Sequence, residues 1–213
     1  MKTMAEHWND LAVDHDDNFL NRIKMAEFYD EVERQIDKCD TKTDILVLGC
    51  GTGLEIERIR HRASVHAVDI SEGMLAELNK KRLHPEITLT TQCGSFLEMD
   101  FPAGAYDIVL SCHALHHFNE AQKLALYGKI HASLRPGGVF VNGDITEKDA
   151  AGEAAAFDRA EAIYREQNQP FGSLHIDVPF CVEHEIQVLR AAGFGGVSVK
   201  KEWERAKLMR AVK

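Results

Sequence analysis

Long hydrophobic runs and paired cysteines are both missing from this sequence. No stretch approaches the roughly 20 consecutive apolar residues of a membrane-spanning helix, and the first residues lead into polar sequence without the apolar segment of a signal peptide. The 5 cysteines are widely spaced and include no CxxC pair, which argues against a zinc knuckle and against a disulfide framework. We therefore expect a cytoplasmic protein with reduced thiols and no membrane partner.

An excess of basic residues is also missing. The chain carries 25 Lys and Arg against 34 Asp and Glu, a formal net charge of −9. Because a general nucleic-acid binder needs a strongly basic face, no nucleic-acid partner is expected. A length of 213 residues with 45% hydrophobic content instead suits one domain, residues 1–213, with a full hydrophobic core.

What is present is an alternation of strand and helix patterns. Apolar or β-branched runs predict strands at 45–48, 64–70, 87–91, 106–111 and 139–142. Helices are predicted at 54–62, 71–82 and 120–134, and a turn at 135–138. This alternation predicts an α/β fold with a doubly wound, mostly parallel sheet and helices on both faces.

The last third of the chain departs from this rhythm. Helices are predicted at 150–167 and 182–192, and strands at 197–201 and 207–212. Because few residues join the two strands, they are expected to form an antiparallel hairpin.

The first predicted strand runs into three glycines at alternate positions, Gly49, Gly51 and Gly53. Glycine allows the polar groups of a ligand to approach bare backbone. The dinucleotide fingerprint GxGxxG would place its third glycine where this chain has Leu54. The loop therefore indicates a nucleoside-like ligand and counts against a nicotinamide-dependent oxidoreductase.

A carboxylate closes the second predicted strand. Asp69 lies 20 positions after Gly49, where a carboxylate can accept two hydrogen bonds from ribose hydroxyls. The alternative is an acid that interacts with the N-terminus of the helix predicted to begin at Ser71. The glycine spacing favours the ribose.

Three motifs in order resemble the class I S-adenosylmethionine-dependent methyltransferases of the small-molecule type: VLGCGTG at 47–53, AVDISEGML at 67–75 and LRPGG at 134–138. The resemblance covers about residues 42–145. It implies a seven-stranded sheet with an antiparallel last strand, S-adenosylmethionine as cofactor, and methyl transfer to an O, N or C atom of a small-molecule acceptor. The alternatives are a non-catalytic regulatory module that binds S-adenosylmethionine or, less expected, the oxidoreductase.

The resemblance also implies the cofactor contacts. Gly49, Cys50, Gly51 and Gly53 would lie under the methionine part, and Asp69 would hold the ribose. The backbone of Ser111 and Cys112, at the end of the fourth predicted strand, would meet the methionine amino group.

Adenine recognition follows the family less closely. Ile70 and Met74 would flank the ring. Many relatives carry a Gly-Asp pair after the third strand, whose acid binds the adenine amino group, but this chain has Gly94-Ser95 followed by Phe96. That difference leaves the adenine to the Ser95 hydroxyl or to backbone.

A histidine cluster follows the fourth predicted strand. If this segment is helical, His113, His116 and His117 fall on one face at i, i+3 and i+4. Three alternatives compete: a metal site, a structural pair that lines the cofactor pocket, and a general base that faces the substrate. No further ligand is dictated nearby, so no metal is predicted.

Asp144 ends the fifth predicted strand, at the edge of the sheet where such folds place ligands. Its simpler role would be to cap the next segment. Because some small-molecule relatives use a histidine and an acid at similar places, the predicted catalytic residues are His116, His117 and Asp144.

Two further segments are expected to flank the pocket. Residues 8–19 resemble a short lead-in helix that covers the cofactor, within an N-terminal helical cover at 1–40, and Phe19 either closes the pocket or packs on the core. Residues 146–181 lie where the family places variable substrate-binding insertions. The expected partner is a small-molecule methyl acceptor, and a homodimer is left open.

Overall fold

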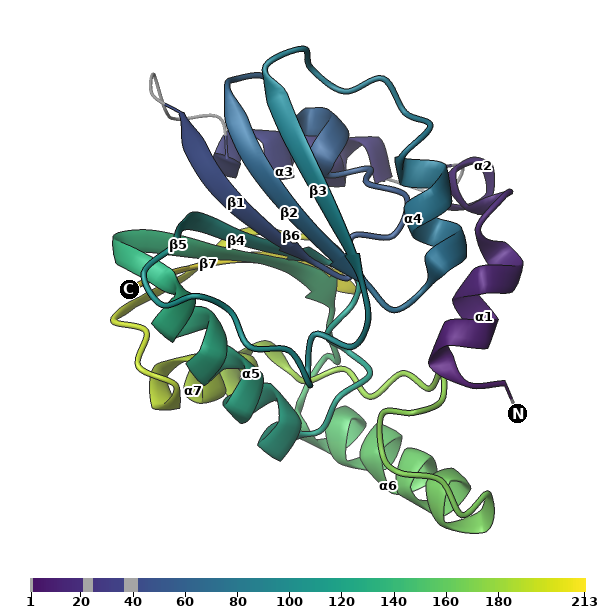
Figure 1. Ribbon diagram of the computed structural model, residues 1–213. Helices are drawn as coiled ribbons and strands as arrows, with labels where there is room; N and C mark the ends of the chain where they lie inside the picture. Colours follow the sequence, from purple (N-terminus) through teal and green to yellow (C-terminus); the bar gives the residue numbers. More distant parts are fainter. Residues whose placement is uncertain (1, 21–24, 37–41) are drawn as a thin grey trace.

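The computed structural model describes residues 2–20, 25–36 and 42–213, and within them a central sheet flanked by helices (Figure 1). The strands are β1 (Thr43–Leu48), β2 (Ala63–Asp69), β3 (Ile87–Cys93), β4 (Tyr106–Cys112), β5 (Leu134–Ile145), β6 (Gly196–Glu202) and β7 (Ala206–Val212). The helices are α1 (Met4–Leu11), α2 (His15–Leu20), α3 (Met25–Ile36), α4 (Glu72–Leu78), α5 (Glu120–Ser133), α6 (Ala150–Glu166) and α7 (Val182–Ala191), with a short 3₁₀ turn, η1 (Ile56–Arg58).

The sheet has seven strands in the order β3-β2-β1-β4-β5-β7-β6. Neighbours from β3 to β5 pair in parallel, whereas β7 pairs antiparallel with both β5 and β6. The predicted fold class is thereby confirmed, including the antiparallel last strand and the closing hairpin. The order reverses at β1, so β1 and β4 open a crevice at their carboxyl ends.

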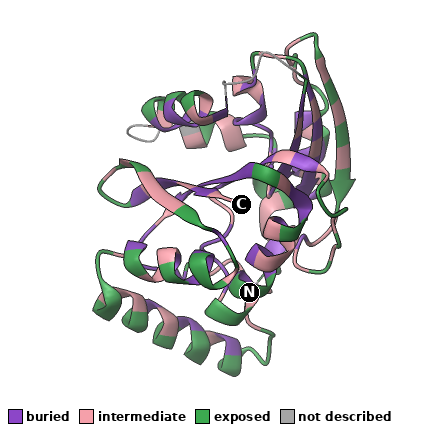
Figure 2. Ribbon diagram, turned by 90° about the vertical axis from the view of Figure 1, so that its left-hand side faces the viewer, coloured by how far each residue is buried: buried purple, intermediate pink, exposed green. Residues whose placement is uncertain are grey.

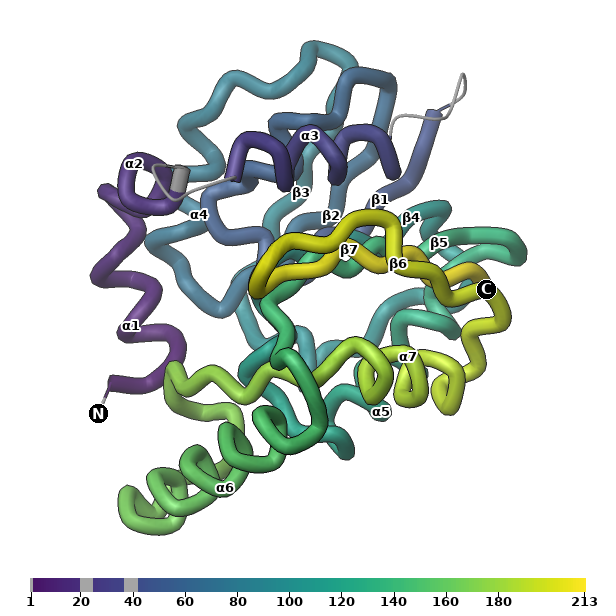
Figure 3. Tube along the Cα trace, turned by 180° about the vertical axis from the view of Figure 1, so that it is seen from behind, coloured from purple at the N-terminus to yellow at the C-terminus, as the bar shows by residue number. Residues whose placement is uncertain are grey.

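Alternation along β1 separates two cores on opposite faces of the sheet. Ile45 and Val47 pack with α3 and α4 on one face, and Leu46 and Leu48 pack with α5 and α7 on the other. All four side chains are fully buried, which is expected of a central parallel strand covered on both sides. Figure 3 shows α3 and the pair α5–α7 on opposite sides of the sheet.

A third, small cluster lies away from both cores. Ala160 and Tyr164 of α6 pack with Leu174 and Val178, whereas most of α6 faces solvent (Figure 2). This cluster therefore stabilises the segment 174–178 rather than the sheet.

In the first half of the chain one predicted helix is wrong and another is shorter than predicted. The predicted helix at 54–62 is only the 3₁₀ turn η1, and the chain is already extended at Ile59. Leu54, Ile56 and Ile59 are buried as expected, but their spacings of two and three do not continue one helical face. The helix predicted at 71–82 begins at its Ser71 cap and ends at Leu78.

The predicted turn at 135–138 lies inside β5 instead. The pairing with β4 moves from Tyr106–Leu134 directly to Ile108–Val139, so four residues bulge out of the strand. Arg135 holds this bulge through Asp107 at 2.6 Å and Asp44 at 2.8 Å.

Cys39 lies outside the described residues, and the other four cysteines form no disulfide. Within the described ranges, no helix combines the length and the apolar character needed to cross a membrane.

Candidate active site

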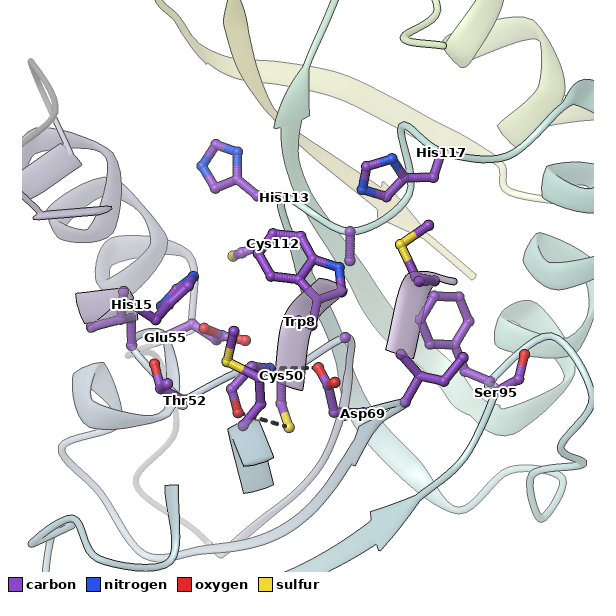
Figure 4. A pocket seen from close by; sticks show the side chains of 18 of the residues that line it. Trp8, His15, Cys50, Thr52, Glu55, Asp69, Ser95, Cys112, His113 and His117 are labelled. Atoms are coloured by element: carbon purple, nitrogen blue, oxygen red, sulfur yellow. Dashed lines mark hydrogen bonds between the residues drawn. The ribbon is translucent and has the colours of Figure 1, made fainter. Parts of the chain in front are cut away.

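A pocket opens at the carboxyl ends of β1, β2 and β4 (Figure 4). Of the predicted cofactor residues, those that line it are Gly49, Cys50, Gly51, Asp69, Ile70, Met74, Ser95, Phe96 and Cys112. Gly53, Gly94 and Ser111 do not line it. The pocket therefore collects most of the predicted cofactor positions from four separate segments, at the carboxyl ends of β1, β2, β3 and β4.

The three glycines of the loop serve different purposes, although all have a positive φ. A Cβ at Gly49 would lie 2.4 Å from the Cβ of Ala114, and one at Gly53 would lie 2.4 Å from Leu78. A Cβ at Gly51 would meet nothing within 4 Å. Gly49 and Gly53 are thus required for packing, and Gly51 leaves open space in the pocket.

Asp69 is buried and rigidly held. Its Oδ2 accepts a hydrogen bond from the Gly51 amide and its Oδ1 one from the Ser71 amide, both at 2.8 Å. Burial raises the pKa of Asp69 above its usual range, against the opposing effect of these two amide donors. Each oxygen keeps a further lone pair that can accept a hydroxyl of a ligand.

Asn9 connects the N-terminal segment to this site. Its Oδ1 accepts from the Ser71 hydroxyl at 2.7 Å and from the Gly73 amide at 2.9 Å. Ser71 also accepts from the Met74 amide as the N-cap of α4. Helix α1 is thereby attached to the element that carries the predicted adenine contacts.

Aromatic rings of the same segment line the pocket. Trp8, His15 and Phe19 all face it, and the ring of Phe19 stacks on His15 with centroids 5.2 Å apart. Asp16 anchors this region to the glycine loop, where it accepts from the Thr52 hydroxyl, and to Lys81 after α4, at 2.6 Å. Phe19 meets both expectations, since it lines the pocket and also packs against the core.

Sequence reasoning missed Glu55. Its side chain is 3% exposed, lines the pocket, and has no hydrogen-bond partner for Oε1 among the described residues. Figure 4 shows the carboxylate turned into the pocket. Burial raises the pKa of Glu55 to about 8. The only signal was an acid between the apolar residues Leu54 and Ile56, which the predicted helix would have turned to solvent.

The predicted helical histidine face is wrong. Residues 113–118 form an irregular loop, and His113 adopts a left-handed backbone with φ 53°. The Leu115 amide donates to Asp144 at 2.9 Å, which holds the loop against β5 and prevents a helix. The ring of His113 packs on Phe28 and Phe19, apart from His117 (Figure 4).

His116 and Asp144 form a buried ion pair behind the pocket wall. The Nδ1–Oδ1 distance is 2.5 Å, and the side chains are 8% and 7% exposed. Burial lowers the pKa of His116, but the carboxylates of Asp144 and Asp177 outweigh it and raise the pKa to about 9. Burial opposes ionisation of Asp144, yet His116 holds the pKa of that carboxyl well below its usual range.

His117 is the one predicted catalytic residue that lines the pocket. Its Nδ1 donates to the Ile176 carbonyl at 3.1 Å, whereas its buried Nε2 has no partner among the described residues. Burial lowers the pKa of His117 well below its usual range, and the neighbouring His116 and His175 add to the effect.

The structure adds two residues from the segment predicted to be the substrate-side insertion. Asp177 places Oδ1 3.5 Å from His116 Nε2 and 3.5 Å from His117 Nδ1. The ring of His175 lies 4.8 Å from that of His117. The Val178 amide, which donates to the His116 carbonyl at 2.7 Å, joins the two segments. No sequence pattern links positions so far apart.

Comparison with known proteins agrees with this geometry. A family model described as a methyltransferase domain matches residues 45–138. The carboxy-S-adenosyl-L-methionine synthase of Helicobacter hepaticus is 25% identical over 73% of this chain and 70% of its own length. The malonyl-[acyl-carrier protein] O-methyltransferase of Bacillus cytotoxicus is 26% identical over 74% of this chain, which spans only 55% of that relative.

Among solved structures, a DhpI–SAH complex has a similar fold, with a TM-score of 0.72 at 20% identity over 97% of this chain and 93% of that one. The sheet order, the glycine loop with its facing carboxylate, and the match to the methyltransferase domain agree with one another. Together with the methyltransferase domain matched at residues 45–138, these observations support a class I S-adenosylmethionine-dependent methyltransferase.

Proposed function

We propose that the protein transfers the methyl group of S-adenosylmethionine to an O, N or C atom of a small-molecule acceptor in the cytoplasm, without a nucleic-acid or membrane partner. The observation that supports this proposal most directly is the hydrogen bond between the glycine loop and Asp69 at the carboxyl ends of β1 and β2. An electron pair of the acceptor, a lone pair on O or N or a π or carbanion pair on C, forms the new bond to the methyl carbon, and the C–S electron pair returns to sulfur. The products are the methylated acceptor and S-adenosylhomocysteine, and the acceptor proton passes to a base or to water.

At the donor end, Asp69 holds the ribose, and Gly49, Cys50 and Gly51 form the loop under the methionine part. The backbone of Cys112 meets the amino group, while Ile70, Met74, Ser95 and Phe96 surround the adenine. Gly53, Gly94 and Ser111 support these residues from outside the pocket.

We add Glu55 to this set, as the residue that pairs with the methionine ammonium. Its Oε1 is buried without a partner, and a carboxylate in that condition gains most from a cation placed against it. It lines the pocket beside the loop that would lie under the methionine part.

At the acceptor end, His117 contacts the acceptor, because it is the histidine of the predicted triad that reaches the pocket. His116 and Asp144 act as positioning residues: Asp144 fixes the His116 ring, and it also accepts from the Leu115 and Ile145 amides that shape the loop. Residues 146–181 select the acceptor, and the N-terminal cover shields the reacting atoms from water.

Calorimetry with S-adenosylhomocysteine tests the proposal. We expect the wild-type chain to bind one equivalent and Asp69→Ala to lose binding. No binding by the wild-type chain would overturn the proposal, as would a larger thermal shift with NAD than with S-adenosylhomocysteine.

Turnover separates an enzyme from a regulatory module. Acceptor pools incubated with S-adenosylmethionine should yield S-adenosylhomocysteine, and oxygen acceptors are screened first because one relative is named for O-methylation. Binding without turnover on any pool would favour the non-catalytic alternative.

A further inference from the structure

We propose that His116, His117 and Asp177 form a binding site for a divalent transition-metal ion of the zinc type at the acceptor end of the pocket. The sequence predicted no metal here because the histidine cluster lacked a further ligand nearby. Folding of the segment 174–178 against the loop 115–118 supplies that ligand as Asp177.

The donor atoms already converge. One potential ligand atom from each of the three residues lies within 4.8 Å of those of the other two. His116 Nε2 and Asp177 Oδ1 are 3.5 Å apart, and bonds of about 2.0–2.1 Å in a tetrahedral zinc site place ligand atoms about 3.3 Å apart. An ion bound through His117 Nε2 would require that ring to shift, because it is the Nδ1 of His117 that lies 3.5 Å from Asp177 Oδ1.

Both histidines are held in the way that metal-ligating histidines are held. A ligating imidazole commonly donates its other ring N–H to a carboxylate or a backbone carbonyl, which fixes the ring and its tautomer. The Nδ1 of His116 is bonded to Asp144 at 2.5 Å, and the Nδ1 of His117 to the Ile176 carbonyl at 3.1 Å. The Nε2 of His117 is thereby left for a ligand, and the Nε2 of His116 already faces the proposed third ligand, Asp177.

His117 supplies a second, independent observation. Its side chain is 3% exposed, and its Nε2 is buried without a hydrogen-bond partner among the described residues. A buried ring nitrogen without a partner is costly, and a metal ion would satisfy it. The side chain of Asp177 is 51% exposed, so an ion has a path from solvent.

The donor set selects the class of ion. Two imidazoles and one carboxylate suit zinc and its neighbours better than magnesium or calcium, which prefer oxygen ligands. Three protein ligands leave at least one coordination position open. Since His117 borders the pocket, an acceptor oxygen can occupy that position; this role rests on the proposed function, whereas metal binding itself does not.

Metal titration of the chelator-stripped full chain tests the site. We expect calorimetry to show one Zn²⁺ per chain, and Co²⁺ to produce visible d–d absorption that Zn²⁺ displaces. Asp177→Asn and His117→Gln should each weaken Zn²⁺ binding by at least about 100-fold, and Asp144→Asn by about 10-fold through the orientation of His116.

Two matched variants serve as controls. His66→Gln changes a histidine bonded to Tyr106 and Gln92 outside the pocket, and Asp158→Asn changes an exposed carboxylate on α6; both should bind Zn²⁺ as the wild type does. No Zn²⁺ binding by the wild-type chain would overturn the proposal in favour of a metal-free ion-pair network, and so would Asp177→Asn and His117→Gln variants that bind normally. S-adenosylhomocysteine binding, measured on the same samples, reports the proposed function separately.

Discussion

The two ends of the pocket, which we propose to hold the methyl donor and the methyl acceptor, are constructed in different ways. At the donor end, Asp69 is the last residue of β2 and Gly51 lies three residues after the end of the adjacent parallel strand β1, and the Gly51 amide donates to Asp69. At the acceptor end, His116, Asp144 and Asp177 come from three segments and meet through their side chains, because His116 contacts both carboxylates. Pairing of adjacent strands is enough to bring the residues at their ends together. The arrangement of the acceptor end depends instead on how two loops and α6 pack.

The largest expected effect comes from Asp144→Asn, which separates stability from cofactor binding. Removing one charge of a buried pair costs about 3 to 5 kcal/mol, so the melting temperature should fall by roughly 10 °C. Affinity for S-adenosylhomocysteine should stay within a factor of about 3, because Asp144 does not line the pocket. Thermal unfolding measures the loss of stability, and calorimetry measures the affinity for S-adenosylhomocysteine. A drop of affinity along with stability would contradict the independence of the two ends of the pocket.

Gly49→Ala should damage the donor end instead. The added methyl would lie 2.4 Å from the Cβ of Ala114, and the alanine would have to keep the positive φ of Gly49. The clash and the backbone strain together should lower the free energy of unfolding by about 2 to 3 kcal/mol and displace the loop. Gly51→Ala is the matched control, since its methyl meets nothing within 4 Å, and it should cost only about 1 kcal/mol. Equal losses of melting temperature in the two variants would contradict the different roles given to these glycines.

Glu55→Gln should weaken S-adenosylhomocysteine binding by about 10- to 100-fold, the loss of a charge-assisted hydrogen bond. Binding of 5′-methylthioadenosine, which lacks the amino-acid part, should be unchanged. An equal loss for both ligands would place Glu55 elsewhere in the site.

The same residue predicts a pH dependence. The Glu55 pKa of about 8 lies above its ordinary value of 4.5, so its contribution to stability is full below pH 4.5 and is lost as pH rises through 8. Glu55→Gln should therefore melt higher than wild type near pH 8 and equally near pH 4.5. The ammonium group of bound S-adenosylhomocysteine would lower the pKa of Glu55, so ligand binding near pH 7 should release a proton. Calorimetry in two buffers of different ionisation enthalpy measures this release, which should be absent in Glu55→Gln.

The smallest expected effect tests the support of the acceptor end. Tyr164→Phe removes the hydroxyl that donates to the Leu174 carbonyl at 2.9 Å, a loss of about 1 kcal/mol. Amide hydrogen exchange should become faster across 174–178 and stay unchanged in the glycine loop. Faster exchange in both regions would mean that the two ends of the pocket are not independent.

The errors of sequence interpretation share one physical origin. The apolar residues Leu54, Ile56 and Ile59 are buried as expected, but burial on a short connection does not require a helix. The same error hid Glu55, because a helical turn would have placed it in solvent. The shared helical face considered for the histidines likewise does not form, because the Leu115–Asp144 hydrogen bond and the left-handed backbone of His113 shape this segment as a loop.

By itself, the sequence determined the parallel sheet, its antiparallel end, the donor loop and the facing Asp69, because each of these depends on a local period or on a strand–turn unit. Only the tertiary structure decided the acceptor end. His116 and Asp144 are 28 residues apart in sequence, and His117 and Ile176 are 59 apart. Side chains that far apart meet only after the sheet has formed and α6 has packed against the segment 174–178, and no local pattern records that packing.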